Sequence, residues 1–180
     1  MRLRLAAALA ALGLGTATGG ALAQECRIAL SLGLDVSSSV DAAEYDLLTG
    51  GLAAALEEPE VQAAFFSAPG RWVALHVYEW SGAEQQLVRI GWTPVRDAAT
   101  LDVLAGRLRG QRRSFAEFPT ALGRALGFGS RALQRAPQCA RRTLDISGDG
   151  TNNHGFPPEA ARAHFPFDGV TVNGLVIGET

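Results

Sequence analysis

The stretch that decides the fold is Ile28-Ala-Leu-Ser-Leu-Gly-Leu-Asp-Val-Ser-Ser-Ser-Val40. Its first part, residues 28–34, is mostly apolar, which is typical of a strand buried on both faces of a parallel sheet. The run ends abruptly in Asp35 and the serines 37–39, so a carboxylate and hydroxyls stand where the backbone leaves the sheet. In an open α/β sheet, ligands bind outside the carboxyl ends of the strands. The stretch therefore predicts a polar site at this edge, with oxygen donors that suit Mg²⁺, Mn²⁺ or Ca²⁺.

Apolar periodicity and turn residues predict the remaining elements. Helices are expected at residues 41–56, 59–66, 97–108, 120–133 and 158–164, and further strands at 72–80, 86–92, 142–147 and 171–177. The strands at 72–80 and 86–92 are close enough in sequence to form an antiparallel hairpin. The order predicts an α/β fold with a doubly wound, mostly parallel sheet, one antiparallel edge strand, and helices on both faces.

The N-terminal residues have the features of a secretory signal peptide. Arg2 and Arg4 precede the apolar stretch Leu5 to Leu14, and Ala21-Leu-Ala23 is a small-x-small cleavage site. A membrane anchor is the alternative, but it needs about 20 apolar residues. We expect residues 1–23 to be removed by a Sec-type pathway. The product is a single domain, 24–180, that is secreted or periplasmic in a bacterium and has no membrane span.

The charge balance argues against a nucleic-acid partner. The chain has 18 acidic and 16 basic residues, and removal of Arg2 and Arg4 leaves 14 basic residues, a net charge of −4. Nothing in this composition indicates a phosphate-binding surface. The chain contains no lysine, which excludes any mechanism that needs one. Four arginines form either a solvated helix end or a patch for an acidic ligand: Arg107, Arg109, Arg112 and Arg113.

The only two cysteines, Cys26 and Cys139, are expected to form a disulfide, because an exported chain with an even cysteine count favours one. Asp35 follows Cys26 by nine residues, and Asp149 follows Cys139 by ten. If the two strands are parallel neighbours, both cysteines lie at the same edge of the sheet, within the distance that a disulfide tolerates. The alternative is a pair of buried thiols.

Three polar segments converge on the predicted edge of the sheet. They contain Asp35, Ser37 and Ser39 after the first strand, Thr120 before a helix, and Asp149 after the strand 142–147. The Asp-x-Ser-x-Ser pattern with these partners resembles the metal-ion-dependent adhesion site (MIDAS) of von Willebrand factor type A (VWA) domains. In element order, the resemblance covers nearly the whole of 24–180. More narrowly, residues 144–153 and 172–177 resemble DUF1194, a family of exported bacterial VWA-like proteins.

The resemblance implies a role for each residue of the predicted site. Ser37 and Ser39 would bind Mg²⁺ or Mn²⁺ directly, Thr120 directly or through water, and Asp35 and Asp149 mainly through water. Neutral hydroxyl ligands leave the ion short of negative charge, so it stays electrophilic toward an incoming carboxylate. The resemblance therefore implies a protein-binding module, and no enzyme, that captures an Asp or Glu of a protein partner.

The sequence departs from the VWA pattern at three places. Thr120 follows Phe118-Pro119, where the family has a glycine-containing approach, and the proline is expected to shift the hydroxyl. Gly148 precedes Asp149 where many VWA domains have Thr or Ser. A complete VWA domain also has a final strand and helix after Ile177, so we expect a truncated sequence or a shortened variant.

Other functions have weaker support in the sequence. A structural scaffold with a vestigial site is the main alternative, since Ser, Thr and Asp are also ordinary turn and cap residues. Asp35 and the loop 148–153 also resemble haloacid-dehalogenase phosphatases, but residue 37 is Ser where those enzymes have an acid. A serine hydrolase is not supported, because the sequence contains no Gly-x-Ser-x-Gly motif.

The three histidines are open to more than one interpretation. His76 lies within a predicted strand, where packing is the expected role. His154 follows the loop of Asp149, so it is either a contact to the bound ligand or an ordinary loop residue. His164 is a candidate base by its residue type alone.

Overall fold

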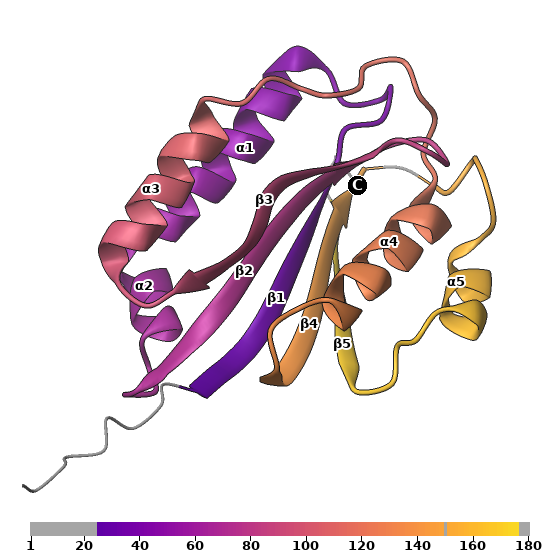
Figure 1. Cartoon of the computed structure of the whole chain (residues 1–180). Helices are drawn as coiled ribbons and strands as arrows, with labels where there is room; N and C mark the ends of the chain where they lie inside the picture. Colours follow the sequence, from indigo (N-terminus) through magenta and orange to yellow (C-terminus); the bar gives the residue numbers. More distant parts are fainter. Residues whose placement is uncertain (1–24, 150, 177–180) are drawn as a thin grey trace, which may run out of the picture.

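The computed structural model describes residues 25–149 and 151–176. The elements run β1 (Glu25–Asp35), α1 (Ala42–Glu57), α2 (Pro59–Phe65), β2 (Arg71–Trp80), β3 (Gln86–Val95), α3 (Ala98–Arg109), α4 (Leu122–Gln134), β4 (Cys139–Gly148), α5 (Pro158–His164) and β5 (Val170–Val176). The strands form a five-stranded sheet in the order β3-β2-β1-β4-β5 (Figure 1). Only β3 is antiparallel to its neighbour, so the predicted fold class is confirmed.

Helices cover the sheet on both faces, and a large apolar core lies between each layer of helices and the sheet. Helices α1, α2 and α3 lie on one side, and α4 and α5 lie on the other (Figure 1). The first core joins side chains of α1 and α3, such as Leu56 and Leu104, to Leu75 of β2. The second joins Leu133 of α4 to Leu144 of β4. These apolar layers fix the strands, and the strands in turn fix the loops at their carboxyl ends.

Most predicted elements are present, with longer strands. Asp41 caps α1 through a capping box with Glu44, as its sequence spacing indicates. Helix α4 is a correction, because it begins at Leu122 with Ala121 as its N-cap and not at Thr120. The hydroxyl of Thr120 donates a hydrogen bond to Ser37 instead of capping the helix.

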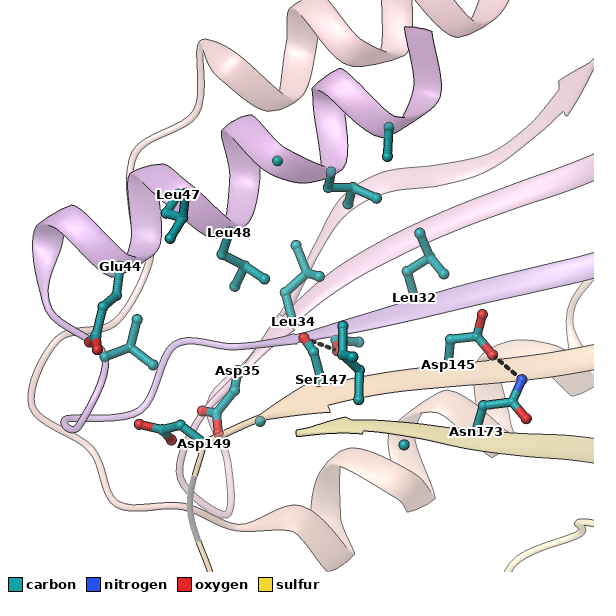
Figure 2. Close-up of a pocket in the computed structure, with 18 residues that line it drawn as sticks. Leu32, Leu34, Asp35, Glu44, Leu47, Leu48, Asp145, Ser147, Asp149 and Asn173 are labelled. Carbon is teal, nitrogen blue, oxygen red and sulfur yellow. Dashed lines mark hydrogen bonds between the residues drawn. The ribbon is translucent and has the colours of Figure 1, made fainter. Parts of the chain in front are cut away.

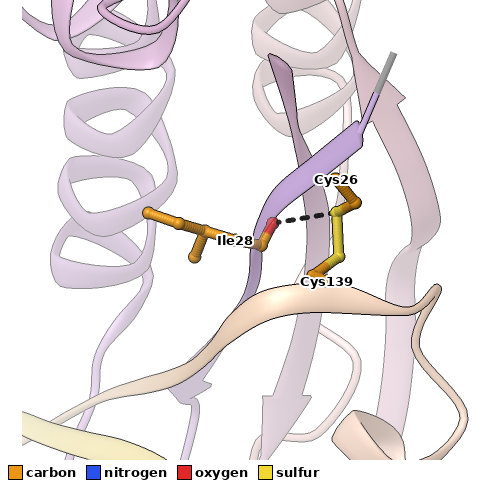
Figure 3. Close-up of a disulfide and its surroundings, with 3 residues drawn as sticks. All are labelled: Cys26, Ile28 and Cys139. Atoms are coloured by element: carbon orange, nitrogen blue, oxygen red, sulfur yellow. Dashed lines mark hydrogen bonds between the residues drawn. A yellow bond between two sulfur atoms is a disulfide. The ribbon is translucent and has the colours of Figure 1, made fainter. Parts of the chain in front are cut away.

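The predicted disulfide is present at the amino-terminal edge of the sheet. Cys26 and Cys139 face each other in the register of β1 and β4, with a Cα–Cα distance of 4.5 Å (Figure 3). Both cysteines lie inside strands, because β1 and β4 begin earlier than their apolar runs. The covalent bond joins the two strands whose opposite ends carry Asp35 and Gly148.

His76 is a packed residue of the second core face. Its Nδ1 hydrogen-bonds with the Ser31 hydroxyl at 2.9 Å, and its ring stacks on Trp92. Burial lowers the pKa of His76 to about 4, so the imidazole is neutral at physiological pH.

The predicted signal peptide, residues 1–23, lies outside the described residues, as does Ile177 at the end of the last predicted strand. Within 25–149 and 151–176, no helix has the length and apolar character needed to cross a membrane.

Candidate metal site

Asp35 forms the base of the candidate site. It is the last residue of β1 and only 2% exposed. Its Oδ1 accepts a hydrogen bond from the backbone N–H of Ser37 at 2.8 Å, which turns the chain sharply after the strand. Its other oxygen, Oδ2, is buried and has no hydrogen-bond partner among the described residues. An unsatisfied buried carboxylate oxygen is costly, so this atom is a candidate for binding a cation or its water.

A chain of hydroxyls connects the three predicted loops. Thr120 Oγ1 donates to Ser37 Oγ at 3.1 Å, and Ser37 Oγ lies 3.2 Å from Ser39 Oγ. Ser39 Oγ donates to Asp149 Oδ1 at 2.9 Å. Ser37 and Thr120 are buried, whereas Ser39 and Asp149 are exposed. All five residues predicted from the sequence therefore lie together at the carboxyl edge of the sheet, where Figure 2 shows Asp35 beside Asp149.

The oxygen spacings suit a small divalent cation. Adjacent ligands of an octahedral Mg²⁺ with bonds of 2.0–2.1 Å are roughly 2.9 Å apart. The hydroxyl–hydroxyl distances of 3.1 and 3.2 Å are close to that value. Together with the unpaired Oδ2 of Asp35, the donor set fits Mg²⁺ or Mn²⁺. Within the described part of the chain, no three His, Cys, Asp or Glu side chains cluster, so such a site depends on its hydroxyls.

The electrostatics of Asp35 also favour a nearby cation. Burial raises the pKa of Asp35 to about 6, and the charge of Asp149 contributes in the same direction. The hydrogen bonds from Ser37 oppose the increase in pKa without cancelling it. At neutral pH the carboxylate is thus ionised in a poorly solvated position, and a positive charge beside it would relieve that cost.

Two asparagines that sequence reasoning missed hold the backbone of Thr120 and of the first turn of α4. Asn153 Oδ1 accepts from the Thr120 N–H at 2.9 Å, and the N–H groups of Asn153 and His154 donate to the Thr120 carbonyl at 3.0 and 3.1 Å. Asn152 Oδ1 accepts from the N–H of Gly123 at 3.3 Å, in the first turn of α4. The signal in the sequence was the pair of amides three and four residues after Asp149, which bind backbone groups well in loops.

His154 has a structural contact in this loop. Its Nδ1 accepts a hydrogen bond from the Ala83 N–H at 3.2 Å, which ties the loop to the β2–β3 turn. The predicted contact of His154 with a ligand stays a prediction.

The Phe118-Pro119 departure leaves the hydroxyl of Thr120 within reach of Ser37. The Phe118 carbonyl accepts from the Ser38 N–H at 2.8 Å and from the Ser81 hydroxyl at 3.1 Å. These bonds hold the backbone just before Thr120, and a shift of its hydroxyl by Pro119 stays a prediction.

Gly148 leaves room for the close approach of β4 to Asp35. A Cβ atom at residue 148 would lie 3.0 Å from Asp35 Oδ2 and 3.4 Å from the Trp80 ring. The glycine therefore keeps the space beside the unpaired oxygen open and lets Asp149 follow directly after the strand.

A cavity of about 890 Å³ adjoins the site on the α1 side of the sheet. Leucines of β1 and α1 line it, together with Leu175 of β5, and Asp35 and Asp149 lie at one end (Figure 2). Its floor also carries the Asp145–Asn173 side-chain hydrogen bond of 2.7 Å.

Solved structures with a similar fold include a von Willebrand factor type A protein and a protein with a MIDAS motif. Proximal thread matrix protein 1 (PTMP1) of the mussel byssus matches with a TM-score of 0.66 at 14% identity, covering 86% of this chain and 39% of PTMP1. Another PTMP1 structure has a zinc-occupied MIDAS motif. The von Willebrand factor type A protein of Catenulispora acidiphila has a TM-score of 0.57 at 19% identity, covering 86% and 34% of the two chains. An aerotolerance-related membrane protein of Bacteroides fragilis has a TM-score of 0.55 at 18% identity, covering 84% and 68%.

The fold and the order of its loops define a VWA-like domain. The sequence belongs to the family DUF1194, described as protein of unknown function, whose family model matches residues 25–180. No curated protein matches the sequence. The chain spans 39% of PTMP1 and 34% of the Catenulispora protein, and its likeness to these structures concerns the fold alone.

Proposed function

We propose that this domain binds Mg²⁺ or Mn²⁺ at Asp35, Ser37, Ser39, Thr120 and Asp149, and captures a carboxylate of a protein partner. The observation that carries the proposal is the meeting of three loops around one buried carboxylate. Its unpaired Oδ2 lies in the same loop cluster as a continuous chain of hydroxyls. The zinc-occupied MIDAS motif of PTMP1, a protein with the same fold, supports divalent-ion binding.

In this proposal some residues bind the ion and others orient the residues that bind it. Ser37 and Ser39 present neutral oxygens as direct ligands and Thr120 binds directly or through water, while Asp149 orients the Ser39 hydroxyl through its 2.9 Å hydrogen bond. Asp35 fixes the turn through the Ser37 N–H and places a negative charge behind the ligands. A bound divalent ion would supply a Lewis acid, and hydroxyl ligands keep it attractive to an external Asp or Glu.

We propose that the protein is an exported adhesion-type module and that it is not an enzyme. Domain boundaries of 1–23 for the signal peptide and 24–180 for the mature domain remain part of this proposal. The alternative is a scaffold without a functional site, which one observation favours. The hydroxyls satisfy one another through the Thr120–Ser37–Ser39–Asp149 chain and so need no ion for their hydrogen bonds.

Water-proton relaxation of the Mn²⁺-loaded domain tests the complete proposal. The probes are two short peptides that differ only in one central residue, Asp or Asn. We expect the Asp peptide to lower the relaxation enhancement, because its carboxylate replaces a metal-bound water, and the Asn peptide to leave it unchanged. Equal responses to both peptides would overturn carboxylate capture, and the absence of any enhancement would overturn metal binding itself.

A further inference from the structure

We propose that Arg113 is a positioning residue of the candidate metal site, a role that rests on the proposed function. Its guanidinium holds two consecutive carbonyls of the loop that carries the serine ligands. Nε and Nη2 donate to the Val36 carbonyl at 3.3 and 3.1 Å, and Nη2 also donates to the Ser37 carbonyl at 2.5 Å. These two carbonyls lie between Asp35 and Ser39, so Arg113 fixes the direction in which the loop leaves β1.

The guanidinium is suited to this task by its shape. Its rigid, planar fork presents several N–H donors at once, whereas a lysine ammonium is a flexible point charge. Arg113 is half-buried, so its bonds are partly shielded from competing water. The bonds to two neighbouring peptide groups constrain the backbone on both sides of the Ser37 Cα, and thereby the direction of its hydroxyl.

The segment that carries Arg113 is held by a second arginine. Three hydrogen bonds run from the side chain of Arg89 of β3 to the segment 111–114: Nε to Gln111 Oε1 at 2.7 Å, Nη1 to Ser114 Oγ at 2.6 Å and Nη2 to the Arg112 carbonyl at 3.0 Å. The segment is thus fixed on both sides of Arg113. Because β3 is part of the sheet, Arg89 and Arg113 together connect the loop of residues 36–39 to the sheet.

A fully buried carboxylate completes the anchor. Glu79 of β2 is 0% exposed and lies 3.5 Å from Arg89. Its Oε2 accepts from the Ser114 N–H at 3.0 Å, and its Oε1 accepts from the Tyr45 hydroxyl at 2.7 Å. A charge this deep in the protein needs such partners to be tolerated. The network therefore runs from Glu79 of β2 through the segment 111–114 to the loop that carries Ser37 and Ser39.

The sign of the effect on metal affinity separates positioning from simple electrostatics. Arg113 carries a positive charge beside a site proposed for a cation, so Coulomb repulsion alone would weaken metal binding. If charge were its only influence, removing the guanidinium would tighten the binding of Mn²⁺. If Arg113 positions the serines, removing it loosens the loop and weakens the binding of Mn²⁺, against the electrostatic trend.

Calorimetric titration with Mn²⁺ distinguishes the two effects in Arg113→Gln, Arg113→Lys and the matched control Arg112→Gln. Arg112 is exposed, and only its backbone carbonyl takes part in the network, so the control removes the same charge without the clamp. We expect Arg113→Gln to bind about tenfold more weakly, which corresponds to ~1.4 kcal/mol. Arg113→Lys should fall between this variant and the unaltered protein, and Arg112→Gln should bind equally or more tightly.

Amide hydrogen exchange of the metal-free proteins supplies a readout that needs no ion. We expect faster exchange at Ser38 and Val40 in Arg113→Gln than in Arg112→Gln, with the strands of the sheet unchanged. Unaltered or tighter Mn²⁺ binding in Arg113→Gln, beside normal binding in the unaltered protein, would overturn the positioning role alone. Absence of Mn²⁺ binding in the unaltered protein would overturn the proposed function and this role together.

Discussion

Thr120 donates its hydroxyl hydrogen to Ser37 across 3.1 Å, although 83 residues separate the two in the chain. This bond joins the loop after β1 to the approach of α4. Asn153 binds the backbone of Thr120 from the loop after β4, so the third loop is connected to the same point. A change in any one loop is therefore expected to reach the ligands contributed by the others.

Asp35→Asn should change the pH dependence of stability in metal-free protein. The pKa of Asp35 rises from 3.8 to about 6 on folding, so the folded state holds this proton more tightly than the unfolded state. The stability contributed by the protonated group is present below about pH 4 and is lost as pH rises through 6. At 1.36 kcal/mol per pKa unit, the loss is about 3 kcal/mol.

The measurement for Asp35 is urea unfolding of both proteins at pH 4 and pH 7 with a chelator present. We compare the free energy of unfolding of Asp35→Asn with that of the unaltered protein at each pH. This difference should favour the variant by about 3 kcal/mol more at pH 7 than at pH 4. A stability difference that does not vary with pH would show that Asp35 titrates normally.

His76→Gln should reveal a dependence of stability on pH that is opposite to that of Asp35. Burial lowers the pKa of His76 from 6.5 to about 4, so the unfolded state binds the proton first on acidification. The folded protein loses roughly 3 kcal/mol as pH falls from 6.5 to 4, and the variant is spared this loss. Because Asp35 acts in the opposite sense over much of this range, the unaltered protein alone should show a shallow profile.

The pH profile of His76→Gln is compared with that of the unaltered protein by urea unfolding at half-unit steps. The difference between the two free energies of unfolding should change steadily between pH 6.5 and 4. A constant difference would mean that His76 has the same pKa in the folded and unfolded states, against its burial beside Trp92.

Two glycine-to-alanine substitutions in helices should have opposite signs. At Gly50 in α1, an added Cβ meets no atom within 4 Å, so alanine should stabilise the protein by about 1 kcal/mol through its helix propensity. At Gly129 in α4, the Cβ would lie 2.6 Å from Leu144 and 2.8 Å from the Tyr78 hydroxyl. This overpacking should cost about 2 kcal/mol. Thermal unfolding checks both, and a stabilised Gly129→Ala would contradict the close packing of α4 on β4.

Loss of the disulfide should destabilise the domain strongly. The Cys26–Cys139 bond spans a sequence separation of 113 residues, and loops of this length are restricted most in the unfolded state. We expect the double variant Cys26→Ala/Cys139→Ala to lose about 4 kcal/mol in urea unfolding. Reductant should have a similar effect on the unaltered protein and none on the double variant. Two free thiols in the oxidised protein would show that the bond does not form.

The sequence allowed the fold and most of the candidate site to be predicted, because both depend on local signals. The apolar run before Asp35 and the capping box at Asp41 are readable within a few residues. The similar spacings from Cys26 to Asp35 and from Cys139 to Asp149 supported the disulfide on the condition that β1 and β4 are parallel neighbours. The structure meets this condition, which places Asp35 and Asp149 at the same edge of the sheet.

The supporting contacts could not be predicted, because they join residues distant in sequence. Arg113 looked like part of a solvated helix end, and only the folded chain brings it to the carbonyls of Val36 and Ser37. Glu79 stood inside an apolar strand, which was a signal of a buried charge with partners elsewhere. Thr120 was expected to open a helix, but long-range hydrogen bonds to Ser37 and Asn153 use the groups that a cap would need.

The central claim is that the hydroxyl of Ser37 binds a divalent cation. The direct measurement is calorimetric titration of chelator-stripped protein with Mg²⁺ and Mn²⁺, comparing the unaltered domain with Ser37→Ala and Ser38→Ala. Ser38 is the exposed neighbour and serves as the matched control. The account predicts saturable binding that is lost in Ser37→Ala and kept in Ser38→Ala, with both variants folded. Equal binding in all three proteins, or no binding in the unaltered domain, would contradict it.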